Sequence, residues 1–298
     1  MPIFNTEVTE TINITENGQY DVARYTSANV SVSGGGGNNT VQYTVTDGVL
    51  GRPNTFIDLT GVTDIADEVC MSMYFLSEIS GAIDMSGLQQ LTGNQCCFSM
   101  FAESGITSID LSGVTTISGE SACVNMCGFC LALESFDLSS LEEVSDNGAN
   151  SMFFGDEALT SANLPALTTI GSNACEQMFS DCPNITSVNM SNVETIGSFG
   201  CSGMFGNDTG LTSITFDSLT TLESGAFNGA FGATSLTSLS FPALTTFSDG
   251  SEDAFSYMLQ DVDGCTVHFP AALQSTMENW QDVQDGFGGT NTTILFDL

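Results

Sequence analysis

The sequence predicts a β-rich repeat solenoid, a right-handed coil of about eight repeats with about 26 residues in each. Two observations predict this fold class. A five-residue block recurs along the chain at steps of 26, 26, 27, 26, 26, 26 and 25 residues. Within each copy the apolar residues keep the same spacing, and Gly, Ser, Thr and Asn fill the segments between the copies. Because a unit of this length cannot bury a core alone, the repeats must stack on one another.

The recurring block has apolar residues at offsets 0, 3 and 5, as in Ile106, Ile109 and Leu111. Side chains alternate along a strand, so offsets 3 and 5 point inward on one face. A second apolar pair follows, for example Val114 and Ile117, and then a turn. We therefore expect one strand, one return segment and two turns in each repeat. The block occupies residues 55–59, 81–85, 107–111, 134–138, 160–164, 186–190, 212–216 and 237–241.

This arrangement is the L-x-x-L-x-L pattern of leucine-rich repeats. Two repeats continue with an Ile-Gly-x-x-Ala-Phe-like stretch, at residues 170–175 and 222–227. Over residues 55–264 the chain resembles the BspA-like leucine-rich-repeat family of bacterial and phage proteins. Other repeats depart from the family pattern by placing Cys where Phe is more usual. The resemblance implies a leucine-rich-repeat solenoid and a role among adhesins and other surface proteins.

The segments before the repeats predict an N-terminal attachment module and a flexible linker. Residues 1–33 are expected to form a β-module with a hairpin turn at Glu16-Asn17-Gly18, a turn signal between alternating strands. Residues 34–54 are expected to be a Gly-rich linker and N-terminal cap, in which Gly34 to Gly37 act as a flexible tether. The module resembles short β-modules of tail-associated structural proteins of phages and prophages.

The solenoid is expected to span residues 55–264 and to end in a cap over residues 265–298. After Pro270, the apolar residues Leu273, Met277 and Trp280 have helical spacing and predict a helix that covers the last repeat. Residues 292–296 read as a final strand.

The charge balance excludes several classes of partner. The chain has 36 acidic and 2 basic side chains and a net charge of −34. This charge repels phosphate backbones and anionic headgroups, so we expect neither nucleic-acid binding nor a polybasic membrane anchor. We find no apolar run long enough to span a bilayer and no secretory signal.

The cysteines predict buried, reduced thiols, because no signal suggests an oxidising compartment. Five of them fall in nearly one column of successive repeats, with Ala149 in the gap, and the rung spacing also permits disulfides. These five are Cys70, Cys96, Cys123, Cys175 and Cys201.

Catalysis is not expected. His268 is the single histidine, the chain has no lysine, and neither a Gly-x-Ser-x-Gly elbow nor a P-loop is present. We therefore expect a protein that is not an enzyme and that needs no cofactor, with calcium as the one candidate ligand.

The candidate binding surface is a column of polar residues at offset 4, which point outward from the strands. It begins with four carboxylates stacked about 5 Å apart. Their mutual repulsion should raise the pKa values or recruit a cation, for which calcium is the natural candidate. A solvated acidic face is the alternative. The column consists of Asp58, Asp84, Asp110 and Asp137, then Asn163 and Asn189, and then Thr215 and Ser240, an uncharged series able to hydrogen-bond along the stack.

Two functions follow from these features. The first is a non-enzymatic virion-associated structural or adhesion protein, such as a tail, baseplate or head-fibre component. Its N-terminal module would bind other virion proteins, and its repeats would bind a host-surface protein or glycan. The chain could also form homo-oligomers. The alternative is a BspA-like adhesin on a bacterial cell surface, which should carry an export signal and a wall anchor.

Overall fold

The computed structural model describes residues 8–13, 28–33, 40–45, 62–248 and 251–298. The first three segments are β1 (Val8–Asn13), β2 (Ala28–Ser33) and β3 (Thr40–Val45), which form an antiparallel sheet in the order β1-β3-β2.

This sheet differs from the expected hairpin. The turn at residues 16–18 and the glycines at 34–37 lie outside the described residues. However, β1 and β2 both pair with β3 rather than with each other. The N-terminal sheet therefore extends past residue 33 into the segment interpreted above as a linker.

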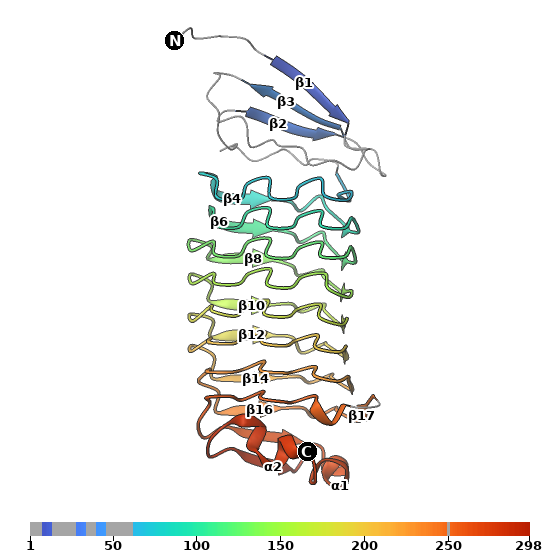
Figure 1. Cartoon of the computed structure of the whole chain (residues 1–298), viewed down its shortest axis with the longest axis vertical. Helices are drawn as coiled ribbons and strands as arrows, with labels where there is room; N and C mark the ends of the chain where they lie inside the picture. The colour runs from blue at the N-terminus through green and yellow to red at the C-terminus, as the bar shows by residue number, and fades with distance from the viewer. Residues whose placement is uncertain (1–7, 14–27, 34–39, 46–61, 249–250) are drawn as a thin grey trace.

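The solenoid has a first side made of short parallel strands that stack one repeat upon the next (Figure 1). Equivalent residues of successive repeats lie side by side, so that Ile83 is in register with Ile109, and Ile109 with Phe136. This parallel stacking confirms the predicted solenoid. The strands are β4 (Ser80–Asp84), β6 (Gly105–Asp110), β8 (Ser135–Asp137), β10 (Ser161–Asn163), β12 (Ser187–Asn189), β14 (Ser213–Thr215), β16 (Ser238–Ser240) and β18 (Thr266–Phe269).

A second side follows in each repeat, where two-residue strands form a seven-stranded parallel sheet. In each strand the second residue is the apolar one, and it is largely buried in the core. These strands are β5 (Gln90–Leu91), β7 (Thr116–Ile117), β9 (Glu143–Val144), β11 (Thr169–Ile170), β13 (Thr195–Ile196), β15 (Thr221–Leu222) and β17 (Thr246–Phe247).

The third side closes each repeat with neither helix nor strand. Three residues spaced four apart have positive φ, as in Gln95 (φ 51), Ser99 (φ 48) and Glu103 (φ 57). The backbone N–H groups alternate in direction. That of Gln95 donates to the Glu120 carbonyl of the next repeat, whereas that of Phe98 donates within its own repeat to the Gln95 carbonyl. This alternation gives the backbone N–H groups hydrogen-bond acceptors in a segment that is neither helix nor strand. The return segment expected from the sequence therefore consists of a two-residue strand followed by this third side.

Aromatic rings stack along the interior of the third side. Centroids of neighbouring rings lie 5.5 Å apart for Phe153 and Phe179 and 5.6 Å apart for Phe179 and Phe205, with nearly parallel planes. Phe136 of β8 joins this stack, 4.5 Å from Phe153 and 5.6 Å from Phe179. The equivalent residue of the next repeat, 26 positions later on β10, is the small Ala162, so a large residue is followed by a small one at this position of the core.

All ten cysteines are buried and unpaired, which confirms their role as small core residues. Burial raises the pKa of the Cys175 thiol to about 12 and that of Cys265 to about 11. One assignment is wrong: the repeating φ pattern puts Cys97, not Cys96, in the column with Cys123. The step from Cys70 to Cys97 is 27 residues, one more than the usual 26, and Cys96 instead donates its thiol hydrogen to the Ala122 carbonyl.

The C-terminal cap has the expected apolar contacts, but its helix is broken. Leu273 and Met277 are buried, and the Trp280 ring packs edge-on against Phe247 at 4.7 Å. Trp280 has extended backbone angles and divides the expected helix into two single turns. The predicted last strand is confirmed. The cap consists of η2 (Ser251–Asp253), η3 (Ala271–Leu273), α1 (Gln274–Met277), α2 (Gln281–Gln284), η4 (Gly286–Gly288) and β19 (Thr293–Phe296), which pairs with β18.

Candidate functional site

The outward carboxylates of the first side brace the turns that follow their strands. Oδ1 of Asp84 accepts hydrogen bonds from the hydroxyl and the backbone N–H of Ser86, at 2.7 and 3.0 Å. Asp110 accepts the N–H of Ser112 in the same way at 2.9 Å. The pattern is an Asx turn, in which a short acidic side chain replaces a backbone acceptor.

These hydrogen bonds overturn the expectation that repulsion raises the pKa of Asp84. The hydroxyl and then the backbone N–H of Ser86 hold the pKa of this exposed carboxyl below its usual value. Hydrogen bonding to the charged form therefore outweighs desolvation, which acts in the opposite direction at this position. Asp137 makes the same bond to the Ser139 N–H, at 2.9 Å.

The two asparagines of the column form the hydrogen bond along the stack that the sequence predicts. The side-chain amide of Asn189 donates to Oδ1 of Asn163 one repeat earlier, at 3.0 Å. The Ser191 hydroxyl in turn donates to Oδ1 of Asn189. Farther along, the Thr215 hydroxyl donates to Oδ1 of Asp217 in its own repeat, so the connected amides and hydroxyls are those of Asn163, Asn189 and Ser191.

Asp58, the first residue of the column, lies outside the described residues. Within the part of the chain that the structure describes, no three His, Cys, Asp or Glu side chains gather closely enough to hold a metal ion. The calcium hypothesis for Asp84, Asp110 and Asp137 stays a prediction, and their turn-bracing role accounts for their recurrence without it.

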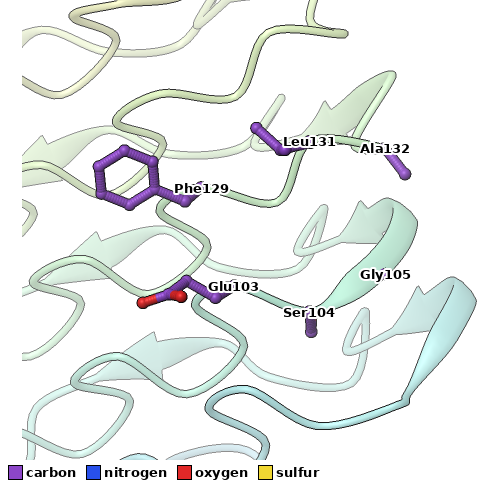
Figure 2. A pocket seen from close by; sticks show the side chains of 6 residues that line it. All are labelled: Glu103, Ser104, Gly105, Phe129, Leu131 and Ala132. Atoms are coloured by element: carbon purple, nitrogen blue, oxygen red, sulfur yellow. The ribbon is translucent and has the colours of Figure 1, made fainter.

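A hollow of about 700 Å³ opens where the chain turns from the third side into the first (Figure 2). We call this turn the corner of the repeat. Before β6 the corner has a single residue, Gly105, outside the core, whereas before β8 it has two, Leu131 and Ala132. The extra residue accounts for the 27-residue step, and the change of corner length creates the hollow. Its lining is Glu103, Ser104, Gly105, Phe129, Leu131 and Ala132.

The apolar wall of this hollow is exposed. Phe129 and Leu131 leave 46% and 61% of their surface open to solvent. Phe129 also has φ 59, a backbone conformation that bulky residues rarely adopt. Figure 2 shows Glu103 beside Phe129, one repeat earlier on the same side of the hollow. The site therefore combines an apolar wall with a carboxylate.

The Phe129 ring is held in place by the next repeat. It packs edge-on against Phe154, with centroids 5.2 Å apart, and it lies over Gly155. A Cβ atom on Gly155 would be 2.8 Å from the ring, so only glycine leaves room there. Phe199 lies over Gly225 in a similar way three repeats farther along, at the first rather than the third of the positive-φ positions. The ring is thus positioned before any ligand arrives.

Two buried carboxyls fasten the neighbouring corners. Oδ1 of Asp156 accepts the backbone N–H of Cys130 at 2.7 Å, and Oδ1 of Asp208 accepts that of Cys182 at 2.7 Å. Both side chains are fully buried, and the second oxygen of each has no hydrogen-bond partner. Burial raises the pKa of Asp156 to about 9 and that of Asp208 to about 8. Both groups therefore carry a proton at neutral pH.

His268 lies on β18, where its Nδ1 is 3.0 Å from Oδ1 of Asp297. Because Asp297 directly follows β19, the pair links β18 to the end of the last strand. No helix in the described residues is long and apolar enough to cross a bilayer.

The repeats match a known family. Residues 127–260 match, in six copies, the family model described as the BspA type leucine rich repeat region. The match covers 134 of the 298 residues, so this stretch of the solenoid is similar to BspA-type leucine-rich repeats. No curated protein and no solved structure matches the chain. A BspA-type repeat region indicates a surface or adhesion type of repeat protein, and leucine-rich-repeat solenoids typically act as non-catalytic interaction scaffolds.

Sequence reasoning missed the hollow and the two buried acids, although signals for both were present. The 27-residue step marked a corner that changes length, and Phe129 stands in a column otherwise held by residues such as Glu103 and Asp181. Asp156 and Asp208 alternate with Cys130 and Cys182 at 26-residue spacing. An acid that shares a column with buried cysteines indicates a buried acid.

Proposed function

We propose that this chain is a non-enzymatic structural and adhesion protein of a virion, which displays its BspA-type solenoid for host or self contact. The solenoid supplies a long polar first side, with one exposed apolar hollow at its corner. The hollow is the observation that carries a binding role, because partly exposed aromatic and aliphatic side chains beside a cavity are typical of interaction sites.

The sheet β1–β3 precedes the solenoid and supports a division between attachment and display. In this proposal the sheet binds other virion proteins, and the repeats meet a host-surface protein or glycan. The net charge of −34 argues against nucleic acid and anionic membranes as partners.

Immunogold electron microscopy of purified particles tests the location. Antibodies against the repeats should label intact virions at regular sites on the tail, baseplate or head. Label that stays with cell-wall fractions and never with particles would contradict the proposal.

The second candidate is a bacterial cell-surface adhesin, which the BspA-type match favours. The same antibodies separate the two, because an adhesin should label intact cells in the absence of any particle. In either setting the repeats present a surface to a partner.

A further inference from the structure

We infer that the hollow beside Phe129 and Leu131 binds a protein segment that carries an apolar side chain flanked by Lys or Arg. This inference rests on the proposed role of the solenoid as a display surface and names its partner. It follows from three features of the hollow: its apolar wall, its fixed ring and the charge around it.

The apolar wall is large enough for a side chain with its neighbours. The hollow measures about 700 Å³, within the range of sites that bury organic ligands. Leu131 and Phe129 are among the few large apolar residues exposed on the described solenoid. An apolar side chain that covers them removes this surface from water, which favours binding.

The ring of Phe129 needs no rearrangement to accept a ligand. Phe154 contacts its edge, and Gly155 lies beneath it. Aromatic anchors held in place lose little conformational freedom on association, and this rigidity is typical of residues that dominate binding.

The charge around the hollow selects a basic segment. Glu103 lines the hollow and is exposed, and Glu134 and Glu157 are exposed in the following strand and corner. No Lys or Arg occurs in the part of the chain that the structure describes, so these carboxylates have no basic side chain of that part to pair with. A partner with Lys or Arg would meet complementary charge.

The same charge argues against other occupants. A second copy of this chain also carries a charge of −34, so two copies repel each other at this surface. Glycans need many hydrogen-bond donors, but the only side-chain hydroxyl in the lining, that of Ser104, is buried beside the Cys130 sulfur. A basic peptide with an apolar side chain therefore matches both the apolar wall of the hollow and the carboxylates around it.

The test uses the full chain and three fluorescein-labelled peptides, with binding read by fluorescence anisotropy. The probe is Lys-Lys-Phe-Leu-Lys-Lys. One control peptide replaces Phe-Leu by Ser-Ser, and the other replaces each Lys by Glu. The probe should bind at least about tenfold more tightly than either control, since each control removes one of the two matched features.

Variants of the protein locate the binding. The substitutions F129S and L131S should each weaken binding of the probe by about tenfold. E103Q should weaken it about threefold and make binding less sensitive to salt. F199S is the matched control, because this exposed ring also lies over a glycine but far from the hollow, and it should bind as the native chain does.

Several outcomes would overturn the inference: no binding of the probe, equal binding of the Ser-Ser or Glu peptide, or equal losses in F129S and F199S. Circular dichroism melting of each variant identifies loss of fold, and L131S keeps the test valid if F129S unfolds, because Leu131 is 61% exposed. The peptide result and the particle imaging are independent, so failure of one is distinguishable from failure of the other.

Discussion

At the scale of single residues, Asp156 and Asp208 make the stability of the solenoid dependent on pH. Each carboxyl is fully buried and has one bonded and one unbonded oxygen. The neutral form can stay buried at low cost, whereas the charged form loses its hydration. The folded state therefore keeps both carboxyls protonated.

We expect the chain to be more stable in mild acid than in alkali. The folded-state pKa values, about 9 for Asp156 and about 8 for Asp208, lie above the ordinary value of 3.8. Their contribution to stability is complete below that value and is lost as the pH rises through 8 to 9. Between 3.8 and its folded-state pKa, each carboxyl lowers the free energy of unfolding by about 1.4 kcal/mol per pH unit. Urea unfolding between pH 5 and pH 9 measures the slope.

The double variant D156N/D208N should show a shallower slope than the native chain, because it keeps the acceptor oxygen and loses the titration. Thiols of the unfolded chain ionise above about pH 8.5 in both proteins, so the difference between slopes isolates the two carboxyls. D261N, at an exposed position, is the control. Equal slopes for the native chain and the double variant would refute the assignment.

The Asx turns make a second prediction at this scale. Replacing Asp110 by Ala leaves the Ser112 N–H without its acceptor and should cost about 1 kcal/mol of unfolding free energy. Replacing it by Asn keeps the acceptor, as Asn189 does toward the Ser191 hydroxyl, and should cost much less. Thermal melting of the two variants compares them. If D110N is as unstable as D110A, the charge of Asp110 matters rather than the turn.

At the scale of elements, Phe136 of β8 and Ala162 of β10 form a coupled pair. They hold equivalent positions of successive repeats, 26 residues apart, and Phe136 pairs in register with Ile109 whereas Ala162 pairs with Val188. Because the Phe136 ring extends to Phe179, A162I alone should overpack the core and cost about 1–3 kcal/mol.

Adding F136I should recover most of that loss, since the double variant restores two medium side chains. F136I alone should also destabilise, because it leaves space beside Ala162. A double-mutant cycle by urea unfolding measures the coupling. Additive effects of the two substitutions would show that the residues do not share space.

The elements that periodicity controls were predictable, and those that single residues control were not. Apolar spacing predicted the first-side strands, and the spacing of Leu273, Met277 and Trp280 predicted the cap contacts. Positive φ on the third side arises from the repeated hydrogen bonding between coils, and it places even Phe129 in a conformation that its residue type disfavours. The hollow depended on one inserted residue, whose effect is visible only when two corners are compared in space.

At the scale of the whole molecule, charge and stacking oppose each other. The acidic side chains, 36 in the whole chain, repel one another, while each coil of the solenoid gains its core only from its neighbours. The whole chain has only 2 basic side chains to pair with 36 acidic ones, so internal pairing hardly offsets the repulsion. Counterions must supply the compensation.

We therefore expect the melting temperature to rise as NaCl increases from about 0.01 to about 0.3 M, because salt screens the repulsion. Calcium adds a sharper comparison at equal ionic strength. If the column that includes Asp84, Asp110 and Asp137 holds calcium, millimolar CaCl₂ should raise the melting temperature above that in matched MgCl₂, since calcium tolerates irregular oxygen sites better. The triple variant D84N/D110N/D137N should remove the excess. Equal melting temperatures in the two salts would instead identify this part of the first side as a solvated acidic surface.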